Sequence, residues 1–276
     1  MTAVGIIGGT GKLGGLFRKI FEEEGFEVIV SSRSTALSKE ELIRKSDIVV
    51  VTVPIESTVA VIREITPFMK EGKLLMDLTS LKEEPVNEML KSKADVLGAH
   101  PLFAPSIGDI HGQTIILCPE RITQKDLYQN IFSTLEKRGA NLIVMSPEQH
   151  DKMMAVIQGL THFSAIVLCH CLKDLNFDIK KSLECTSPVY RLTLDMAGRI
   201  LNQKPELYAD ISLLNPKTAE VASQYIKTSK ALFSNIENKD RDGFIKFFEE
   251  ASEYLGEFTA KAEKESNKLI KRMVEK

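Results

Sequence analysis

Residues 4–15 read VGIIGGTGKLGG, and this segment decides the fold. The apolar run Val4–Ile7 predicts a short strand, and apolar residues at helical spacing after the loop predict a helix. Between them, Gly9, Gly11 and Gly14 form the pattern G-x-G-x-x-G. In a strand–turn–helix context, these glycines allow the backbone to approach a pyrophosphate, which the free N–H groups of the helix N-terminus then bind. The segment predicts a dinucleotide-binding loop; the alternative is a glycine-rich turn without a ligand.

The end of the second strand indicates which dinucleotide binds. Phe26–Val30 reads as a strand, and Ser31, Ser32 and Arg33 follow it. An NAD site usually carries an acid here to hold the ribose 2′-hydroxyl, whereas hydroxyls and an arginine suit a 2′-phosphate. We therefore expect NADP to be preferred, with NAD as the second choice; the alternative is a solvated turn arginine. The residues expected to contact the cofactor are Gly8, Gly9, Thr10, Gly11, Lys12, Leu13, Gly14, Ser31, Ser32, Arg33, Val53, Pro54, Ile55 and Ser80.

Strands and helices alternate through the first half of the chain. The β-branched run Ile48–Val53 predicts a strand buried on both faces, as in a parallel sheet, and Pro54 ends it. Further strands are expected at 73–77, 95–97, 114–118 and 141–145, and helices at 57–69, 86–91 and 125–138. This alternation predicts an α/β fold, with a Rossmann-type, doubly wound parallel sheet in a dinucleotide-binding domain of residues 1–146.

A histidine directly before a proline marks a second candidate site. Proline pushes the residue before it toward extended geometry, so we expect His100, before Pro101, at the end of a strand or in a rigid loop. Ligands bind at strand ends in α/β sheets. The alternative is a turn with an incidental histidine.

Helical periodicity dominates residues 147–276, which predicts an all-helical second domain. Ser146 suits a helix N-cap and Pro147 the first helical position, and residues 148–172 then read as one long helix. This helix is apolar on most faces, so we expect other helices to enclose it, including those of a second subunit. Its polar residues argue against a membrane span.

Composition limits the classes of partner. The 276 residues carry a net charge of −2, which does not support nucleic-acid binding. The four cysteines lack the spacing of a zinc site or a disulfide framework, so we expect no metal and a reducing, cytoplasmic location. The first strand runs directly into the glycine loop, so no signal peptide is expected.

Several polar residues of the helical half are candidate ligands. Gln158 and His162 lie four apart on one face of the long helix, and His150 lies in its second turn. Arg191 and Arg199 lie eight apart, roughly on one face of a later helix. The alternatives are a satisfied core histidine and ordinary surface ion pairs of both arginines with the aspartate midway between them.

Together these segments resemble the prephenate dehydrogenase family, which includes arogenate-specific members. The resemblance covers nearly the whole chain and rests on Gly8–Gly14, Asp77–Lys82, Gly98–Phe103, His150–Phe163, Ser187–Arg199 and Leu207–Ile211. It implies a Rossmann domain and a helical domain, residues 147–276, that binds substrate and builds a homodimer. It also implies oxidative decarboxylation of prephenate to 4-hydroxyphenylpyruvate, with hydride transfer to NAD(P), in tyrosine biosynthesis. We expect neither a chorismate mutase segment before the glycine loop nor a regulatory module after the helical domain.

The resemblance also implies roles for single residues. When hydride leaves C4 of prephenate, a carbonyl forms there, so a neutral histidine that accepts the hydroxyl proton stabilises the transition state. We expect His100 to be this base and Ser80 to orient it. The residues expected to bind substrate are Arg199, Arg191, His162, His150, Lys82 and Gln158, with the arginines on carboxylates.

Three alternatives stay open at this point. The substrate is arogenate; or the chain is another two-domain oxidoreductase, such as pyrroline-5-carboxylate reductase or a β-hydroxyacid dehydrogenase; or it is an NADP-sensing regulator without turnover. The glycine loop fits all of them. The His-Pro motif, the His150–His162 segment and the arginine pair together favour prephenate or arogenate oxidation.

Overall fold

The computed structural model of the chain describes residues 1–104 and 107–275. Contacts divide the chain into two compact units. The first unit joins Met1–Ala155 to Ala209–Lys217, and the second joins Val156–Tyr208 to the chain from Thr218 onward.

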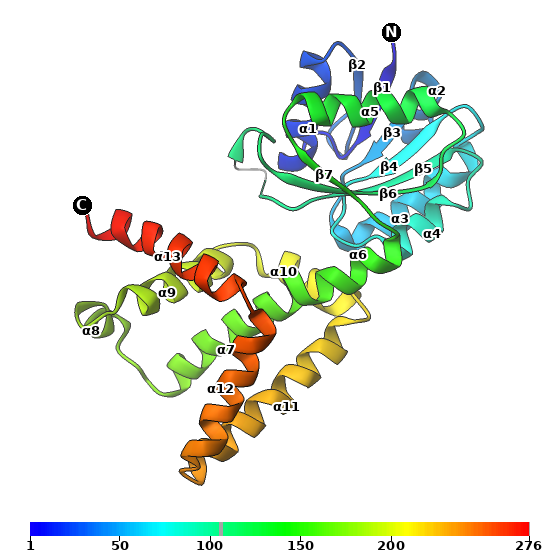
Figure 1. Cartoon of the computed structure of the whole chain (residues 1–276). Coiled ribbons are helices and arrows are strands. Elements are labelled where there is room, and N and C mark those ends of the chain that lie inside the picture. Colours follow the sequence, from blue (N-terminus) through cyan, green and yellow to red (C-terminus); the bar gives the residue numbers. More distant parts are fainter. Residues whose placement is uncertain (105–106, 276) are drawn as a thin grey trace. The chain divides into compact units, whose positions relative to one another are not determined.

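One mixed sheet forms the centre of the first unit. Within the described residues it has seven strands, in the order β2-β1-β3-β4-β5-β6-β7 (Figure 1). They are β1 (Ala3–Ile7), β2 (Glu27–Ser31), β3 (Ile48–Val51), β4 (Leu74–Asp77), β5 (Asp95–Pro101), β6 (Thr114–Arg121) and β7 (Asn141–Val144). The strands from β2 to β5 are parallel, as predicted, and β6 and β7 are parallel to each other.

The sheet departs from the predicted parallel arrangement at one pair, where β6 runs antiparallel to β5. A parallel neighbour requires a long crossover, usually through a helix. Between β5 and β6, residues 102–104 and 107–113 contain no α-helix, and the chain returns directly. His100 and Pro101 are the last two residues of β5, which confirms the expected strand end.

Helices cover both faces of this sheet. α1 (Lys12–Glu23) and α5 (Lys125–Lys137) pack on one face, and α2 (Lys39–Lys45), α3 (Ile55–Ile65) and α4 (Glu83–Met89) pack on the other; the 3-10 turn Thr66–Phe68 follows α3. Alternation along each strand explains this, since Val4 and Ile6 face α1 whereas Ile7 faces α2 and α3. Helix α2 was not among the predicted helices, although the capping box of Ser38 and Glu41 marks its start.

The long helix predicted after Ser146 exists, but it is not a uniform α-helix. It consists of α6 (Pro147–Met154), a π-helical turn (Ala155–Leu160) and α7 (Thr161–Asp174). Ser146 caps it as predicted, and Gln149 completes a capping box. α6 belongs to the first unit, where it packs on α4 and β6.

The expected burial of this helix is not found within the chain. No residue of α7 is buried, and large apolar side chains such as Ile157 and Val167 are about half exposed. By length and composition alone, Pro147–Asp174 could cross a membrane, but the core helix of a soluble protein passes the same test. An apolar helix that its own chain leaves uncovered indicates a surface that another molecule covers.

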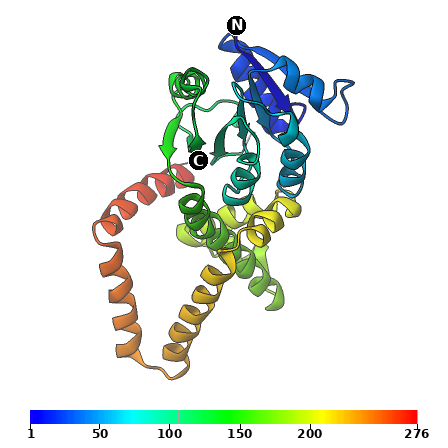
Figure 2. The same ribbon diagram turned by 90° about the vertical axis from the view of Figure 1, so that its right-hand side faces the viewer.

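Helices make up the second unit. They are α8 (Ile179–Glu184), α9 (Pro188–Leu201), α10 (Pro205–Leu214, whose last turns belong to the first unit), α11 (Thr218–Glu237), α12 (Arg241–Leu255) and α13 (Phe258–Val274). α9 and α10 each begin at a proline, which suits the first turn of a helix. α7 packs on α9, and α11 and α12 form a hairpin that turns at residues 238–240 (Figure 2).

Candidate active site

The glycine loop between β1 and α1 brings backbone against backbone. Gly8 has a φ of +91°, and a Cβ there would lie 2.9 Å from the carbonyl oxygen of Thr52. A Cβ on Gly14 would lie 2.6 Å from the carbonyl oxygen of Gly8. The residues therefore form the tight turn that the G-x-G-x-x-G pattern predicts.

A cavity of about 940 Å³ lies beside this loop. The residues that line it are Ile7, Gly8, Thr10, Gly11, Ser31, Ser32, Arg33, Ser34, Leu37, Ser38, Lys39, Thr52, Val53, Pro54, Glu56, Ser57, Val61 and Glu64. Eight of the residues expected to contact the cofactor are among them, from the loop, the end of β2 and the end of β3. Backbone N–H groups of a glycine loop, hydroxyls and a guanidinium form a donor set that fits a dinucleotide.

The other expected cofactor residues have different surroundings. Gly9 packs against the side chain of Val30, Gly14 packs against the loop, and Leu13 packs against the core. Lys12 is exposed at the first position of α1. Their direct contact with a cofactor stays a prediction, as does that of Ile55 and Ser80.

His100 lies in a buried chain of polar side chains at the end of β5. It is 2% exposed, and its Nδ1 lies 2.8 Å from Nε2 of His150. Nδ1 of His150 lies 2.7 Å from Oδ1 of Asp151. The Asp151 carboxylate also accepts hydrogen bonds from the backbone N–H groups of Lys82 and Glu83, each at 2.9 Å, at the start of α4.

These hydrogen bonds fix the position of each ring proton. An ionised carboxylate can only accept, so Nδ1 of His150 carries a proton and donates it to Asp151. Nε2 of neutral His150 must then accept, so Nδ1 of His100 is the donor between the two rings. The lone pair of His100 is thereby placed on Nε2, the nitrogen that faces away from His150. The arrangement gives His100 the tautomer of a general base.

The electrostatic surroundings favour the neutral form of both rings. Burial lowers the pKa of His100 well below its ordinary value of 6.5, and the nearby His150 and the Lys82 ammonium lower it further. Burial also lowers the pKa of His150, although its hydrogen bond to Asp151 acts in the opposite direction. A neutral imidazole is the form that accepts a proton.

Lys82 has a different place from the one expected for a substrate contact. Its side chain is fully buried, and its ammonium donates to the Asp77 carboxylate and, at 2.8 Å, to the carbonyl oxygen of Ala99. Burial raises the pKa of Asp77, whereas the ammonium of Lys82 lowers it. The pair therefore lies beneath the strand end that carries His100, and a role in substrate contact stays a prediction for Lys82. Ser80, half-buried after β4, keeps its predicted role on the same terms.

A second group of expected site residues lies within the helical unit. The rings of His162 and Tyr208 meet edge to face, with centroids 4.5 Å apart. Within the described residues, Nδ1 of His162 is buried without a hydrogen-bond partner, and burial lowers the pKa of this ring. Burial raises the pKa of Tyr208, and the charge of Arg199 acts in the opposite direction. Gln158 lies in the π-helical turn.

Arg191 forms the ion pair that the alternative interpretation anticipated. Its Nε lies 3.0 Å from both carboxylate oxygens of Asp195, and both side chains are nearly half exposed. Exposed pairs of this kind contribute about 1 kcal/mol or less, so a substrate carboxylate can replace Asp195 at small cost.

Three residues of these clusters escaped the sequence analysis: Asp77, Asp151 and Tyr208. Asp77 had a readable signal, because a carboxylate ends the apolar strand β4. Asp151 follows His150 directly, but only the fold shows that its carboxylate turns back to that ring and to the start of α4.

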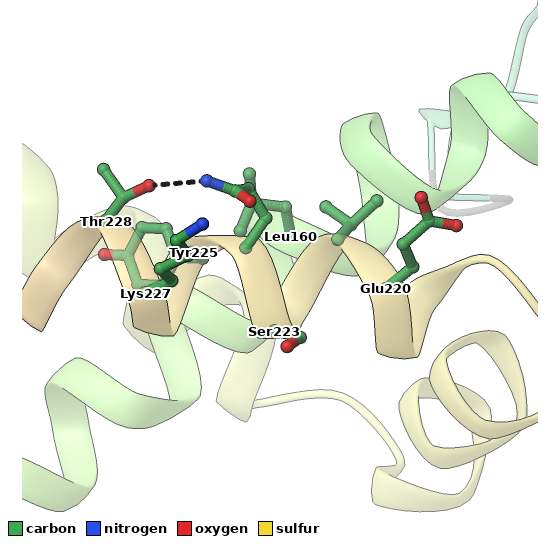
Figure 3. Close-up of a pocket in the computed structure, with 8 residues that line it drawn as sticks. Leu160, Glu220, Ser223, Tyr225, Lys227 and Thr228 are labelled. Carbon is green, nitrogen blue, oxygen red and sulfur yellow. Dashed lines mark hydrogen bonds between the residues drawn. The ribbon is translucent and has the colours of Figure 1, made fainter.

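Another hollow, of about 620 Å³, lies along α11 in the helical unit (Figure 3). Glu220 and Lys227 line it together with Leu160, and Gln224 donates to Thr228 at 3.2 Å along its edge. The residues that line it include no candidate catalytic residue, so the site chemistry is assigned to the two groups above.

Family models match both parts of the chain. Residues 28–144 match the nucleotide-binding domain of prephenate dehydrogenase, and residues 146–250 match its dimerization domain. A probable arogenate/prephenate dehydrogenase of Methanocaldococcus jannaschii is 39% identical over 97% of this chain, which spans 64% of that relative. The T-protein of Haemophilus influenzae is 34% identical over 96% of this chain, which covers 70% of that protein.

Solved structures show the same fold. Prephenate dehydrogenase from A. aeolicus, in complex with hydroxyphenyl propionate and NAD+, has a TM-score of 0.72 at 20% identity, covering 91% of this chain and 96% of that one. Synechocystis arogenate dehydrogenase has a TM-score of 0.71 at 18% identity, covering 90% and 97%. The paired matches of the two family models, in the order of the two halves, establish the relationship: the chain belongs to the prephenate dehydrogenase family.

Proposed function

We propose that this protein oxidises and decarboxylates prephenate, or its amino counterpart arogenate, with NADP as the preferred hydride acceptor. The observation that carries the proposal is the buried series of hydrogen bonds from His100 to His150 and from His150 to Asp151, which presents a neutral histidine in the tautomer of a base. The dinucleotide-shaped donor set beside the glycine loop and the family membership support it.

Each group of the site has its own part in this proposed reaction. Nε2 of His100 accepts the proton of the C4 hydroxyl as the C4–H bond breaks and the C4 carbonyl forms. A nicotinamide, when bound, accepts the hydride. The ring carboxylate leaves as CO2, and the electrons of its broken C–C bond complete the aromatic ring and pass to the C4 oxygen. That oxygen takes the proton back from His100, and prephenate yields 4-hydroxyphenylpyruvate. Asp151 and His150 hold the base in its tautomer throughout.

The helical unit supplies the groups for substrate recognition. Prephenate carries two carboxylates, and arginine binds such groups in bidentate fashion. We assign this role first to Arg199, whose charge acts on Tyr208, the ring partner of His162, and second to Arg191, which exchanges Asp195 for the substrate.

A preference for NADP is supported by the end of β2. Ser31, Ser32 and Arg33 line the cavity at the point where an acid would select the free 2′-hydroxyl of NAD. A guanidinium there favours the additional phosphate.

We also propose that the helical unit forms a homodimer. Large apolar side chains on its helices are exposed in the single chain: Val167, Tyr225, Ile226, Phe233, Ile236, Phe244, Phe248 and Phe258. An exposed apolar area of this kind on a dimerization domain supports a second copy of the chain as the molecule that covers it.

The decisive test measures NADPH formation by the purified chain with prephenate and with arogenate in parallel. Oxidation of either substrate supports the proposal, and the ratio of the two kcat/KM values assigns the substrate. Binding of NADP without turnover of either one would instead favour the regulatory alternative.

A further inference from the structure

The cavity beside the glycine loop has two cations on its walls, Arg33 and Lys39, together with two carboxylates, Glu56 and Glu64. Lys39 begins α2, and Glu64 lies near the end of α3. Nζ of Lys39 lies 2.6 Å from Oε2 of Glu64, so an ion pair joins the two helices that border the cavity.

We infer that Lys39 is a second cation for the 2′-phosphate of NADP and that its pairing with Glu64 tunes the choice between NADP and NAD. The inference rests on the proposed NADP preference and deepens it. A 2′-phosphate brings a charge of about −1.5 to −2, more than Arg33 alone neutralises. Without Lys39, the negative charge of the Glu64 carboxylate would repel that phosphate.

Geometry lets Lys39 serve both partners. An ammonium has three N–H donors, so Nζ can keep its bond to Glu64 while it donates to a phosphate oxygen. The lysine and glutamate side chains are 33% and 58% exposed, so their mutual attraction is weak and the lysine is free to shift its position. NAD offers a neutral hydroxyl at the same point and gains little from either residue.

The ion pair makes distinct predictions for its two members. Replacing Lys39 by methionine leaves Glu64 unneutralised, so Lys39→Met should weaken NADP binding by ~10-fold or more and leave NAD binding within about twofold. Glu64→Gln removes the repulsion and should strengthen NADP binding. In the double variant, the loss caused by Lys39→Met should be smaller than in the single one, because the two residues act on each other.

The test is a titration of the full chain with NADP+ and with NAD+, without substrate, by calorimetry. Lys39→Arg should restore NADP affinity, and Lys45→Met, on the same helix but outside the cavity lining, is the matched control. Arg33→Ala reports separately on the proposed preference.

The outcomes separate the two ideas. One outcome is that the wild type prefers NADP and Arg33→Ala lowers this preference, whereas Lys39→Met leaves it unchanged. That outcome overturns the role of Lys39, and the NADP preference stands. Equal loss of both dinucleotides in Lys39→Met assigns the ion pair to packing of α2 on α3 and also overturns the role. A wild type without preference for NADP overturns both. Because the readout is affinity, the absence of dehydrogenase turnover would not affect the result.

Discussion

The Asp151 carboxylate accepts three N–H groups: one from the ring of His150 and one each from the backbones of Lys82 and Glu83. In the proposed mechanism, this buried carboxylate controls the reactivity of His100. The carboxylate fixes one tautomer, and the second ring passes that choice to the first.

His100→Asn removes the base but keeps a polar side chain of similar size. The turnover number should fall ~100-fold or more, in the range that general-base catalysis contributes. Steady-state kinetics with the better of the two substrates measure this, with NADP affinity as the control for an intact cavity. Near-normal turnover would contradict the assignment of His100.

Asp151→Asn tests the tautomer directly. An amide that turns its NH2 toward His150 forces the proton of that ring onto Nε2, and the same exchange places a proton on Nε2 of His100. The turnover number should fall about as far as in His100→Asn, roughly 100-fold, although His100 is still present. Asp126→Asn, an exposed position on α5, is the matched control. Ordinary turnover in a folded Asp151→Asn protein would refute the relay.

The lowered pKa of His100 predicts the acid limb of the pH profile. The base acts when neutral, and burial keeps it neutral until the pH falls well below 6.5. The ratio kcat/KM should therefore stay level as the pH decreases through 6.5 and decline only in more acidic solution. Circular dichroism at each pH verifies that the chain is folded; an inflection at or above 6.5 in folded protein argues against His100 as the group observed.

For single residues, the sequence predicted the place of a residue in its strand better than the side chains that it contacts. Pro101 indicated that His100 ends a strand, and the structure confirms it. The contact with His150 joins residues 50 positions apart, and no local pattern encodes it. Asp151 was overlooked for the same reason.

Among the elements, the strands were the most predictable. Runs of β-branched residues such as Ile48–Val51 are buried on both faces, and such runs have few alternatives to a central strand. The direction of β6 was missed because an apolar run carries no sign of direction. The π-helical turn at Ala155–Leu160 was missed because its sequence is compatible with an ordinary helix.

The glycine loop provides a test at the level of the element. Gly14→Ala places a Cβ 2.6 Å from a backbone carbonyl oxygen, so it should lower the free energy of unfolding by ~1–3 kcal/mol and weaken dinucleotide binding. Gly15 lies in the same helix, and the atom nearest to a Cβ there is the carbonyl oxygen of Gly9 at 4.0 Å, so Gly15→Ala should raise stability by about 0.5–1 kcal/mol. Urea denaturation of the two variants compares them, and equal effects would mean that the loop tolerates expansion.

On the scale of the whole molecule, sequence indicated an α/β half followed by a helical half. It did not indicate that residues 209–217 return to the first unit, where the Asn215 amide donates to the backbone carbonyl of Asp151 at 2.8 Å. A hydrophobicity pattern shows which residues are apolar but not which chain covers them, so the sequence left open whether α7 is enclosed by its own chain or by a second subunit.

The proposed homodimer is testable on the apolar face of α7 and α11. Phe163, Val167, Tyr225, Ile226 and Phe233 border a shallow hollow of about 280 Å³ there. Placing a charge in this face by Phe233→Glu should convert a dimer to a monomer in sedimentation equilibrium, because an unpaired buried carboxylate is strongly unfavourable. Ser234→Glu adds the same charge to the neighbouring position of α11, outside the residues that border the hollow. A dimeric Phe233→Glu protein would place the interface on another face.

The anchoring of α4 by Asp151 has a consequence for the substitutions that this protein can tolerate. One carboxylate secures the first turn of a helix and also sets the proton inventory of the base. A substitution of Asp151 should therefore lower both the stability of the start of α4 and the proposed catalytic activity.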